Sequence, residues 1–475
     1  MKTEKCNLDL RSIIKSKFTR YAILIFMVFI LYASSFKHGF STEDYSILLA
    51  TIQGFKNFSL FDVFVNAFFQ PSFYRPIPAW TFFHYLYAIF GLNPLGYRIV
   101  VFSIFCCNAI LVYTLLNKLS KNDIVSFIGA VFYITRGTNN DPIRWICLDN
   151  EIIMSFFILL ALVVYVEYLA KKDLKFYIFS ILFTVLAIMS KEPAIMLPLL
   201  IFCIELIHLE ERSITEIKKI ICRIFPFLLI FAICFGRLLF FRYQTSPGPY
   251  ELQFSLNILV KNLIFYIPNL FNNIVESIIF ALIIITCVFS LIKHKQQLSK
   301  IFIMFLFIFL SVIPFIFFKT QLYPYYLGVA QIGCSILLTF SLNYISKTPN
   351  KFQKLLFVGL IVVFLISGFL ASNINDQQVT NVEYVKNKWV DTINSKINSD
   401  FSSNNIVLIQ NSNPWVEVLL QGNGNTLRIE NKNITSVYYN TIPEGIAYNQ
   451  FPVYVFNYSN NELQFEKKIF SRNEL

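Results

Sequence analysis

Residues 151–169 read EIIMSFFILLALVVYVEYL, an apolar run whose only carboxylates lie near its ends. A helix rises 1.5 Å per residue, so a run of this length crosses a hydrocarbon core of roughly 30 Å. Backbone polar groups in lipid must be paired within the segment, and the run is therefore expected to be a membrane-spanning helix. Similar runs recur at 21–36, 301–318 and 355–371. The sequence thus predicts an all-α polytopic membrane protein.

The composition of the whole chain supports this prediction. Of its 475 residues, 56% are hydrophobic and 14% are charged, whereas about 25% of residues in soluble domains are charged. The net charge of +12 comes mostly from short loops between apolar runs and forms no basic patch in a polar segment, which excludes a nucleic-acid partner. The cysteines lie mostly within apolar runs, without the spacing of a disulfide framework or a zinc site.

The apolar runs predict about eleven spans. The N-terminal tail at 1–20 is expected to lie in the cytoplasm, before the first span. With this orientation, Lys and Arg are roughly threefold denser in the inner loops than in the outer ones. Segment 77–91 is apolar but short, and counting it as a span would reverse this bias. It is therefore expected to be an interfacial or re-entrant helix on the outer face. Besides 21–36, the spans are expected near 99–116, 124–135, 151–169, 176–190, 193–207, 224–241, 273–292, 301–318, 325–345 and 355–371.

The predicted transmembrane domain occupies 21–372 and carries two long outer loops, 37–98 and 242–272. Segment 373–475 is polar and rich in Asn, and it follows the last span on the outer side. Its short alternating stretches predict strands, so we expect a small α/β or β-containing extracytoplasmic domain. These stretches are 405–410, 416–420, 426–430, 434–439 and 453–458.

The first outer loop begins with HGFSTEDY at residues 38–45. A carboxylate that neighbouring helices partly shield accepts a proton more readily, so Glu43 and Asp44 are candidate general bases toward a hydroxyl. The alternative is a solvated helix cap, with Ser41 as the cap and Asp44 at the third helical position.

Cationic groups follow on the same predicted face. Tyr74 and Arg75 lead into the interfacial segment, where a guanidinium can clamp a phosphate or simply extend to the membrane surface. The tight turn SKEP at 190–193 places Lys191 and Glu192 at the membrane boundary. There Lys191 could neutralise a lipid phosphate, and Glu192 could orient a hydroxyl or bind a cation.

Aromatic and acidic groups complete the set of candidates. Trp145 could stack on a sugar ring, with Asp149 or Glu151 binding hydroxyls, unless this segment is an ordinary turn with an interfacial Trp. Arg242 is a candidate for phosphate contact at the outer end of its helix. Tyr325 belongs either to the site or to an aromatic belt at the membrane boundary.

Taken in chain order, these motifs resemble those of the GT-C membrane glycosyltransferases that use polyprenyl-phosphate sugars, and most closely the protein O-mannosyltransferase and aminoarabinose-transferase group. The resemblance covers roughly residues 20–345. It implies that a sugar on a polyprenyl-phosphate carrier enters from the outer leaflet, and that a first-loop carboxylate deprotonates an acceptor hydroxyl, which attacks C1 with inversion. The acceptor could be a glycan, a lipid or a protein, and the need for a divalent cation stays open.

The resemblance also assigns roles to the candidate residues. It implies that Asp44 is the base, with Glu43 beside it. It implies phosphate contacts at Arg75, Lys191 and Arg242. It also implies that Glu192 is an acidic group of the active site. The order Glu–Asp departs from the Asp–Asp or Asp–Glu pairs of the family, which leaves open which of the two is the base.

Two other functions compete with an enzyme. A transporter or flippase of a lipid-linked saccharide could use the same outer groups, although the sequence shows no clear inverted repeat or broken helices. A non-catalytic assembly or receptor protein would depend mainly on residues 375–475. No Walker loop, dinucleotide-binding or zinc-protease motif is present in a suitable context.

Overall fold

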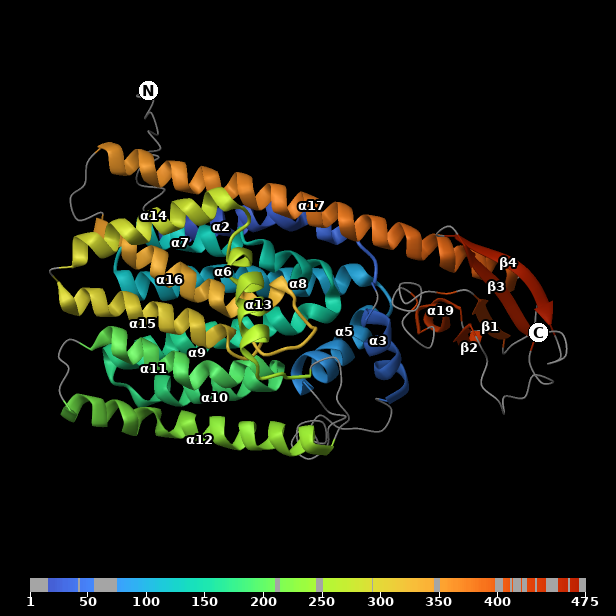
Figure 1. The fold of residues 1–475 in the computed structure, drawn as a ribbon, viewed down its shortest axis with the longest axis horizontal. Helices are drawn as coiled ribbons and strands as arrows, with labels where there is room; N and C mark the ends of the chain where they lie inside the picture. Colours follow the sequence, from blue (N-terminus) through green and yellow to red (C-terminus); the bar gives the residue numbers. More distant parts are fainter. Residues whose placement is uncertain are drawn as a thin grey trace, which may run out of the picture.

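Most of the described chain is helical, and its long helices run side by side along the longest dimension of the molecule (Figure 1). The computed structural model describes residues 16–41, 43–54, 75–209, 214–244, 251–292, 294–345, 351–397, 405–410, 412, 420, 425–431, 434–440, 452–459 and 462–469. Helices coincide with all the predicted spans. They are α2 (Lys17–Tyr32), α6 (Pro94–Ser120), α7 (Asp123–Ile134), α9 (Asp149–Lys171), α10 (Leu174–Ser190), α11 (Leu197–His208), α12 (Ile214–Gln244), α14 (Ile274–Leu291), α15 (Lys295–Val312), α16 (Gly328–Ile345) and α17 (Lys351–Ile397).

The helices confirm a polytopic membrane architecture. Within the described residues, 8 helical segments are long and apolar enough to cross a membrane. Helices α7, α10 and α11 have 12, 17 and 12 residues, fewer than the roughly 20 that a full span needs. The total of about eleven spans therefore stays a prediction. Segment 77–91 is helical, as η4 (Pro76–Phe82) and α5 (Phe83–Phe90), and its interfacial position stays a prediction too.

Short polar side chains begin several helices. The side chains of Asn93, Asn122 and Asp173 each accept a hydrogen bond from a backbone N–H in the first turn of α6, α7 and α10. These caps satisfy N–H groups that have no partner within the helix. Helices α6 and α9 end at Lys121 and Lys172, whose φ values of 54° and 57° are left-handed and reverse the chain within a few residues.

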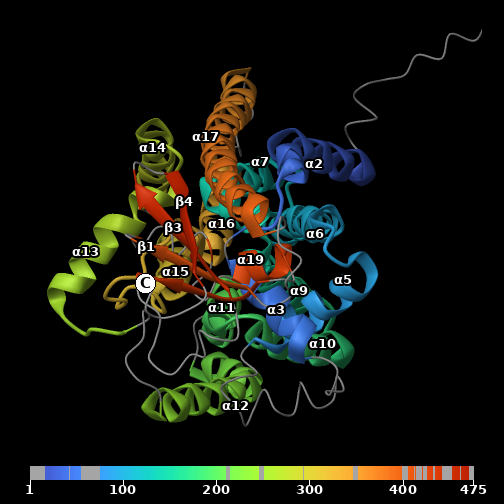
Figure 2. The ribbon, with the colours of Figure 1, turned by 90° about the vertical axis from the view of Figure 1, so that its right-hand side faces the viewer.

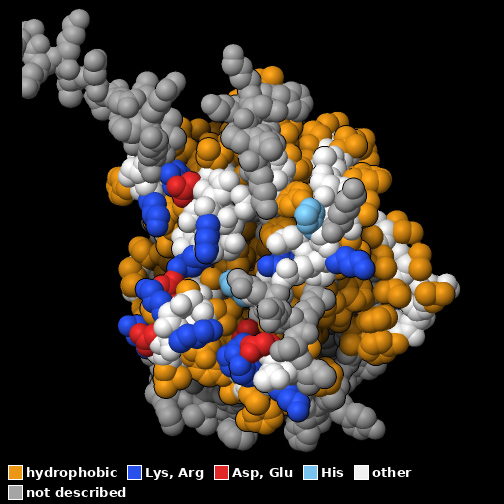
Figure 3. Space-filling view, turned by 90° about the vertical axis from the view of Figure 1, so that its left-hand side faces the viewer, with side chains coloured by type: hydrophobic (Ala, Val, Ile, Leu, Met, Phe, Trp, Pro, Cys, Tyr) orange, Lys and Arg blue, Asp and Glu red, His pale blue; other side chains and the backbone are white. Residues whose placement is uncertain are grey.

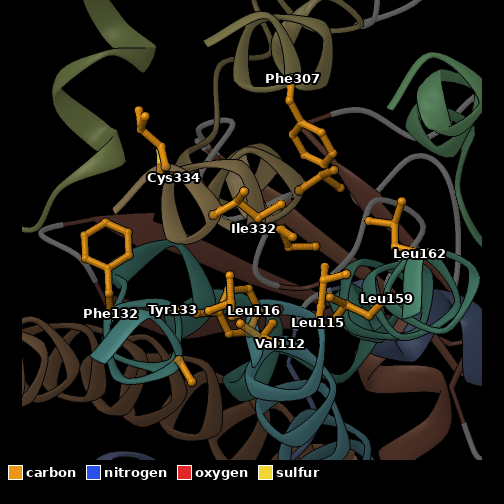
Figure 4. Packing of buried hydrophobic residues seen from close by; sticks show 14 of the residues in the cluster. Val112, Leu115, Leu116, Phe132, Tyr133, Leu159, Leu162, Phe307, Ile332 and Cys334 are labelled. Carbon is orange, nitrogen blue, oxygen red and sulfur yellow. The ribbon is translucent and has the colours of Figure 1, made fainter. Parts of the chain in front are cut away.

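Helix α16 lies at the centre of the bundle, where nearly all its side chains are buried. Large side chains from the surrounding helices pack around it, among them Leu116 of α6, Phe132 of α7 and Phe307 of α15 (Figure 4). A Cβ at Gly129 would lie 2.2 Å from Thr339 Oγ1, so only glycine allows α7 and α16 to approach this closely. The bundle is thus held by dense apolar packing, as protein interiors generally are.

An ion pair is buried where α7 and α14 meet. Arg136 and Glu276 both have side chains that are 0% exposed, and Arg136 Nη2 donates to Glu276 Oε1 at 2.8 Å. The guanidinium also lies over the Phe132 ring, 4.1 Å from its centroid. Two charges buried together are tolerated only because each neutralises the other.

Replacing Glu276 with Gln is expected to lower the free energy of unfolding by about 3–5 kcal/mol, because the Arg136 charge would stay buried without a counter-charge. Thermal unfolding of the purified protein measures the change. The matched control is Glu251→Gln, which breaks an exposed pair with Lys319 at 3.0 Å and should cost under about 1 kcal/mol. Equal small losses in both variants would contradict the assignment of a stabilising role to the buried pair.

Helix α17 continues without a break from the bundle into the C-terminal region (Figure 1). It has 47 residues and so passes the predicted domain boundary at 372/373. Its last turns pack Trp389 and Ile393 against strand residues such as Val407 and Phe456, which form a second apolar core. The C-terminal domain is therefore joined to the bundle by a continuous helix.

The C-terminal domain contains a four-stranded sheet in the order β2-β1-β3-β4. Its central strand β1 pairs in parallel with β2 and β3, and β4 pairs antiparallel with β3. Figure 2 shows this sheet at one end of the bundle. A β-containing domain is thus confirmed. The strands are β1 (Asn405–Gln410), β2 (Ile434–Tyr439), β3 (Val453–Ser459) and β4 (Glu462–Ile469).

The strand predictions for this domain were partly wrong. Stretch 426–430 is a helix, α19 (Asn425–Glu430), rather than a strand. Parallel strands such as β1 and β2 need a crossover connection, commonly a helix, and α19 lies in that connection. The sequence also missed β4, and 416–419 lie outside the described residues.

Candidate active site

Short segments that connect the long helices gather at the end of the bundle that faces the sheet (Figure 1). Helix α3 contacts η6, η4 contacts both α9 and α10, and η9 contacts η5, α8 and α15. The predicted outer segments therefore meet in space although they are far apart in sequence. They are η1 (Ala33–Lys37), α3 (Glu43–Gly54), η4, η5 (Gly137–Asn139), α8 (Asn140–Arg144), η6 (Ile146–Leu148), η7 (Glu192–Met196) and η9 (Pro324–Leu327).

Asp44 lies in the first turn of α3 with 0% exposure. Its Oδ2 accepts a hydrogen bond from the Ser41 N–H at 2.8 Å, and its Oδ1 accepts one from the Cys147 N–H at 2.6 Å. The contact with Ser41 is the kind of capping contact that the sequence offered as an alternative to a base. Each carboxylate oxygen keeps a further lone pair, so the cap fixes the carboxylate without using all its acceptor capacity.

Burial raises the pKa of Asp44 to about 6, against the opposing effects of the Ser41 N–H, the Arg98 charge and the Cys147 N–H. A carboxyl with such a pKa is largely ionised at neutral pH and still takes up a proton readily. Glu43, by contrast, is exposed, and its Oε2 lies 3.9 Å from Cys147 Sγ. The two adjacent acids therefore occupy different environments.

Asp149 links Asp44 to the cationic side of the site. It is the first residue of α9 and is 1% exposed. Its carboxylate interacts electrostatically with Asp44, Arg75 and Lys191, so all three lie within one electrostatic environment. Its Oδ2 is buried and has no hydrogen-bond partner among the described residues. The structure thus links the first-loop acid through Asp149 to Arg75 and to Lys191, which lies more than a hundred positions away in the sequence.

Both cations are held in ion pairs. Arg75 binds Glu192 through two hydrogen bonds, Nε to Oε1 at 3.1 Å and Nη2 to Oε2 at 3.0 Å. Lys191 pairs instead with Glu151, and both side chains are 4% exposed. Lys191 and Glu192, neighbours in the tight turn, therefore pair with two different partners. The Arg75 side chain is 19% exposed and is therefore partly accessible from outside.

Aromatic rings cover the buried ammonium group. Lys191 Nζ lies 5.2 Å from the ring centroid of Tyr326 and 5.5 Å from that of Tyr325. Tyr325 in turn stacks on Tyr323 with centroids 5.0 Å apart. Cation–π contacts of this kind stabilise a partly desolvated charge, so the tyrosines have a role beyond a membrane-boundary belt.

Arg98 and α17 hold the first outer loop in place. Arg98 is buried and donates from Nε to the His38 carbonyl at 2.7 Å and from Nη1 to the Arg144 carbonyl at 2.6 Å. His38 lies between two carboxylates of α17, with Nε2 at 2.9 Å from Asp376 and Nδ1 at 3.0 Å from Glu383. The sequence gives no signal for these contacts, because the partners of His38 lie 338 and 345 positions away.

Of the remaining predicted site residues, Trp145 is described in full, whereas Arg242 and Tyr74 are not. Trp145 is half-buried between α8 and η6, and its Nε1 has no partner among the described residues. Arg242 belongs to the last turns of α12, but its side chain lies outside the described residues, as does Tyr74 altogether. Cys147 is a neighbour that the sequence did not single out, and Glu151, a candidate for binding hydroxyls, is the ion-pair partner of Lys191.

The described residues do not assemble a metal site of three or more His, Cys, Asp or Glu side chains. Asp44 and Asp149 interact electrostatically, and both Asp44 oxygens accept backbone hydrogen bonds.

No protein-family model matches the sequence, and no curated protein matches it. Among solved structures, the chain is similar to the crystal structure of ArnT from Cupriavidus metallidurans bound to undecaprenyl phosphate, with a TM-score of 0.47 and 10% sequence identity. The similarity covers 92% of this chain and 93% of that one. A similarity at this level assigns no activity by itself, and the function must be argued from the site.

Proposed function

We propose that this chain is an integral-membrane glycosyltransferase that moves a sugar from a polyprenyl-phosphate carrier to an acceptor hydroxyl. The observation that carries the proposal is that Asp149 interacts electrostatically both with Asp44 and with the cations Arg75 and Lys191, at one end of a membrane bundle. A proton acceptor beside cations is what the displacement of a lipid phosphate by a hydroxyl requires.

In the proposed reaction Asp44 takes the proton of the acceptor hydroxyl. The hydroxyl oxygen forms a bond to C1 of the sugar while the bond between C1 and the phosphate oxygen breaks, with inversion at C1. Polyprenyl phosphate leaves with the electron pair of the broken bond. Stabilising the charge on this phosphate should be the largest contribution to catalysis, and we assign this role to Arg75 and Lys191.

The ion pairs set conditions on this step. The phosphate must share Arg75 with Glu192, and it can do so because a guanidinium offers five N–H donors. Lys191 is buried against Glu151 and acts on the phosphate as a nearby charge. Arg242 is proposed as a further phosphate contact from α12, and Tyr74, Trp145 and Tyr325 as neighbours of the carrier or sugar. A divalent cation is an optional addition that the proposed mechanism does not need.

We place this site on the extracytoplasmic face, with the N-terminus in the cytoplasm and the C-terminal domain outside. Lys and Arg side chains are prominent on the end of the bundle away from the sheet (Figure 3). Positive charge on one side of a membrane protein favours the cytoplasm for that side. The donor would then reach the site laterally from the outer leaflet, and the acceptor is a glycan, lipid or protein of the cell envelope.

The direct experiment is incubation of the purified protein with radiolabelled polyprenyl-phosphate sugars and an envelope acceptor fraction. Transfer of label to the acceptor, with release of polyprenyl phosphate, supports the proposal. Movement of intact labelled carrier across proteoliposomes without cleavage would support the flippase instead. The densely packed α16 at the bundle centre favours the transferase, because a flippase needs a path between the two faces.

The pKa of Asp44 predicts the pH dependence of transfer. The protonated carboxyl cannot accept a proton, so kcat/KM should fall as the pH drops through about 6, by about tenfold between pH 7 and pH 5. A pH profile of kcat/KM for the donor checks this. The fall of kcat/KM at low pH should persist in Glu43→Gln. If this fall disappears in that variant, Glu43 is the base instead.

A further inference from the structure

A cavity of about 460 Å³ lies beside the candidate active site. Its wall is built from η5, α8, the segment around η8 (Pro268–Leu270), η9 and one face of α17. Its volume is in the range of small-molecule sites, roughly 300–1,000 Å³. Trp145 is the described lining residue to which the proposed reaction already assigns a role.

The cavity adjoins the active site through two of its lining residues. Trp145 precedes the η6 segment whose Cys147 N–H binds Asp44. Pro324 precedes Tyr325, whose ring covers the Lys191 ammonium. The cavity wall therefore includes the residues that precede two segments of the candidate active site, although Asp44, Arg75 and Lys191 are not among the described lining residues.

The chemistry of the wall is polar and aromatic but not cationic. Trp145 and Phe271 supply ring surfaces, and Asn269, Asn375 and Gln378 supply amides. None of the described lining residues is Lys or Arg. The acid among them, Asp141, accepts a hydrogen bond from Asn375 Nδ2 at 2.7 Å. Such a wall suits a ligand with many hydroxyl groups and an apolar ring face, and it disfavours a phosphate or another anion.

Several polar atoms at this wall lack partners. Thr138 is 3% exposed, and its Oγ1 has no hydrogen-bond partner among the described residues. The same holds for Trp145 Nε1 and Asn375 Oδ1. Buried polar groups are normally paired, and an unpaired one costs about 1–3 kcal/mol. All three atoms belong to residues that line one cavity, where a bound polar molecule would be a partner that the described chain does not supply.

We infer that this cavity is the acceptor subsite and that it binds a neutral saccharide. The inference rests on the proposed function, because it names what the transferase acts on. The donor is assigned to Arg75 and Lys191, because its phosphate needs the cations that the cavity lacks. The acceptor sugar would stack on Trp145 and turn a hydroxyl toward Asp44, while its remaining hydroxyls bond to Thr138 and Asn375.

The test uses the full-length purified protein and neutral trisaccharides of glucose, mannose and N-acetylglucosamine as probes, with binding followed by tryptophan fluorescence. At least one trisaccharide should bind, and inorganic phosphate should not compete. Thr138→Val keeps the side-chain shape and removes the unpaired hydroxyl, so it should weaken binding roughly fivefold, as for one lost neutral hydrogen bond. Gln378→Trp, on the exposed side of α17, should fill the cavity and abolish binding.

The matched control is Ser35→Ala, which removes another buried and unpaired hydroxyl that does not line the cavity. Both Thr138→Val and Ser35→Ala should hold or raise the melting temperature, because each removes an unsatisfied polar group. Only Thr138→Val should lose affinity. Absence of binding by all three trisaccharides, competition by phosphate, or equal affinity in Thr138→Val would overturn the inference.

Cleavage of the radiolabelled donor without acceptor separates this inference from the proposed function. The cavity variants should release sugar to water at the wild-type rate and lose only transfer to the acceptor. If wild-type protein binds the trisaccharide but never cleaves the donor, the transferase proposal fails while the saccharide site stands. If the donor is cleaved and the cavity variants transfer normally, the acceptor subsite is refuted and the transferase stands.

Discussion

Replacing Asp44 with Asn is expected to lower the rate of sugar transfer by about 10²–10⁴-fold, the usual contribution of a general base. The amide cannot take the acceptor proton, although its size matches that of the carboxyl group. The donor should still bind, because Arg75 and Lys191 are unchanged. The measurement is kcat for labelled sugar transfer at saturating donor, together with the donor KM.

The same variant tests a purely structural role for Asp44. An Asn side chain offers one acceptor oxygen where the carboxylate uses two, toward Ser41 and Cys147, so some loss of stability, about 1–3 kcal/mol, is expected. Glu43→Gln is the neighbouring comparison and should lose less than about tenfold in rate. If Asp44→Asn folds and transfers sugar at the wild-type rate, Asp44 is a helix cap and not the base.

Replacing Lys191 with Met is expected to lower kcat/KM for the donor by about 10²–10³-fold, because a charge near the leaving phosphate is lost. It should also destabilise the fold by about 3–5 kcal/mol, because Glu151 would remain buried without its partner. Transfer kinetics and thermal unfolding measure the two effects separately.

A second substitution separates the effect of Lys191 on stability from its effect on the rate of transfer. In the double variant Lys191→Met with Glu151→Gln, no unpaired charge is buried, so most of the lost stability should return. Transfer should remain low, because the cation is still absent. Recovery of both stability and transfer in the double variant would show that Lys191 serves the fold and makes no contribution to the reaction.

The sequence was most informative about the bundle. Apolar runs such as 151–169 and 355–371 are dictated by the bilayer, which allows only helices of sufficient length to cross it. The apolar character of a run and the charge of its flanking loops are both local features of the sequence. A single sequence is therefore enough to locate the spans. The C-terminal domain was harder, because the same alternating pattern at 426–430 fits a short strand or the short helix α19, and only its position between parallel strands decides.

Part of the candidate site could also be predicted from the sequence. Asp44, Arg75 and Lys191 could be singled out because charged groups at a membrane boundary are few and costly. Their partners could not be identified, since the pairing of Arg75 with Glu192 and of Lys191 with Glu151 depends on how distant loops fold over the bundle. The cavity on α17 was also hidden, because its walls come from segments as far apart as residues 137 and 382.

The most direct test of the central claim uses a polyprenyl-phosphate analogue with a photoreactive group next to the phosphate. After irradiation of the protein in lipid nanodiscs, mass spectrometry identifies the labelled peptides. The proposed site predicts labelling of η4, η7 or η9, close to Arg75, Lys191 and Tyr325, and its loss when unlabelled polyprenyl phosphate competes. Specific labelling confined to the opposite end of the bundle, around Lys121 and Lys172, would contradict the account.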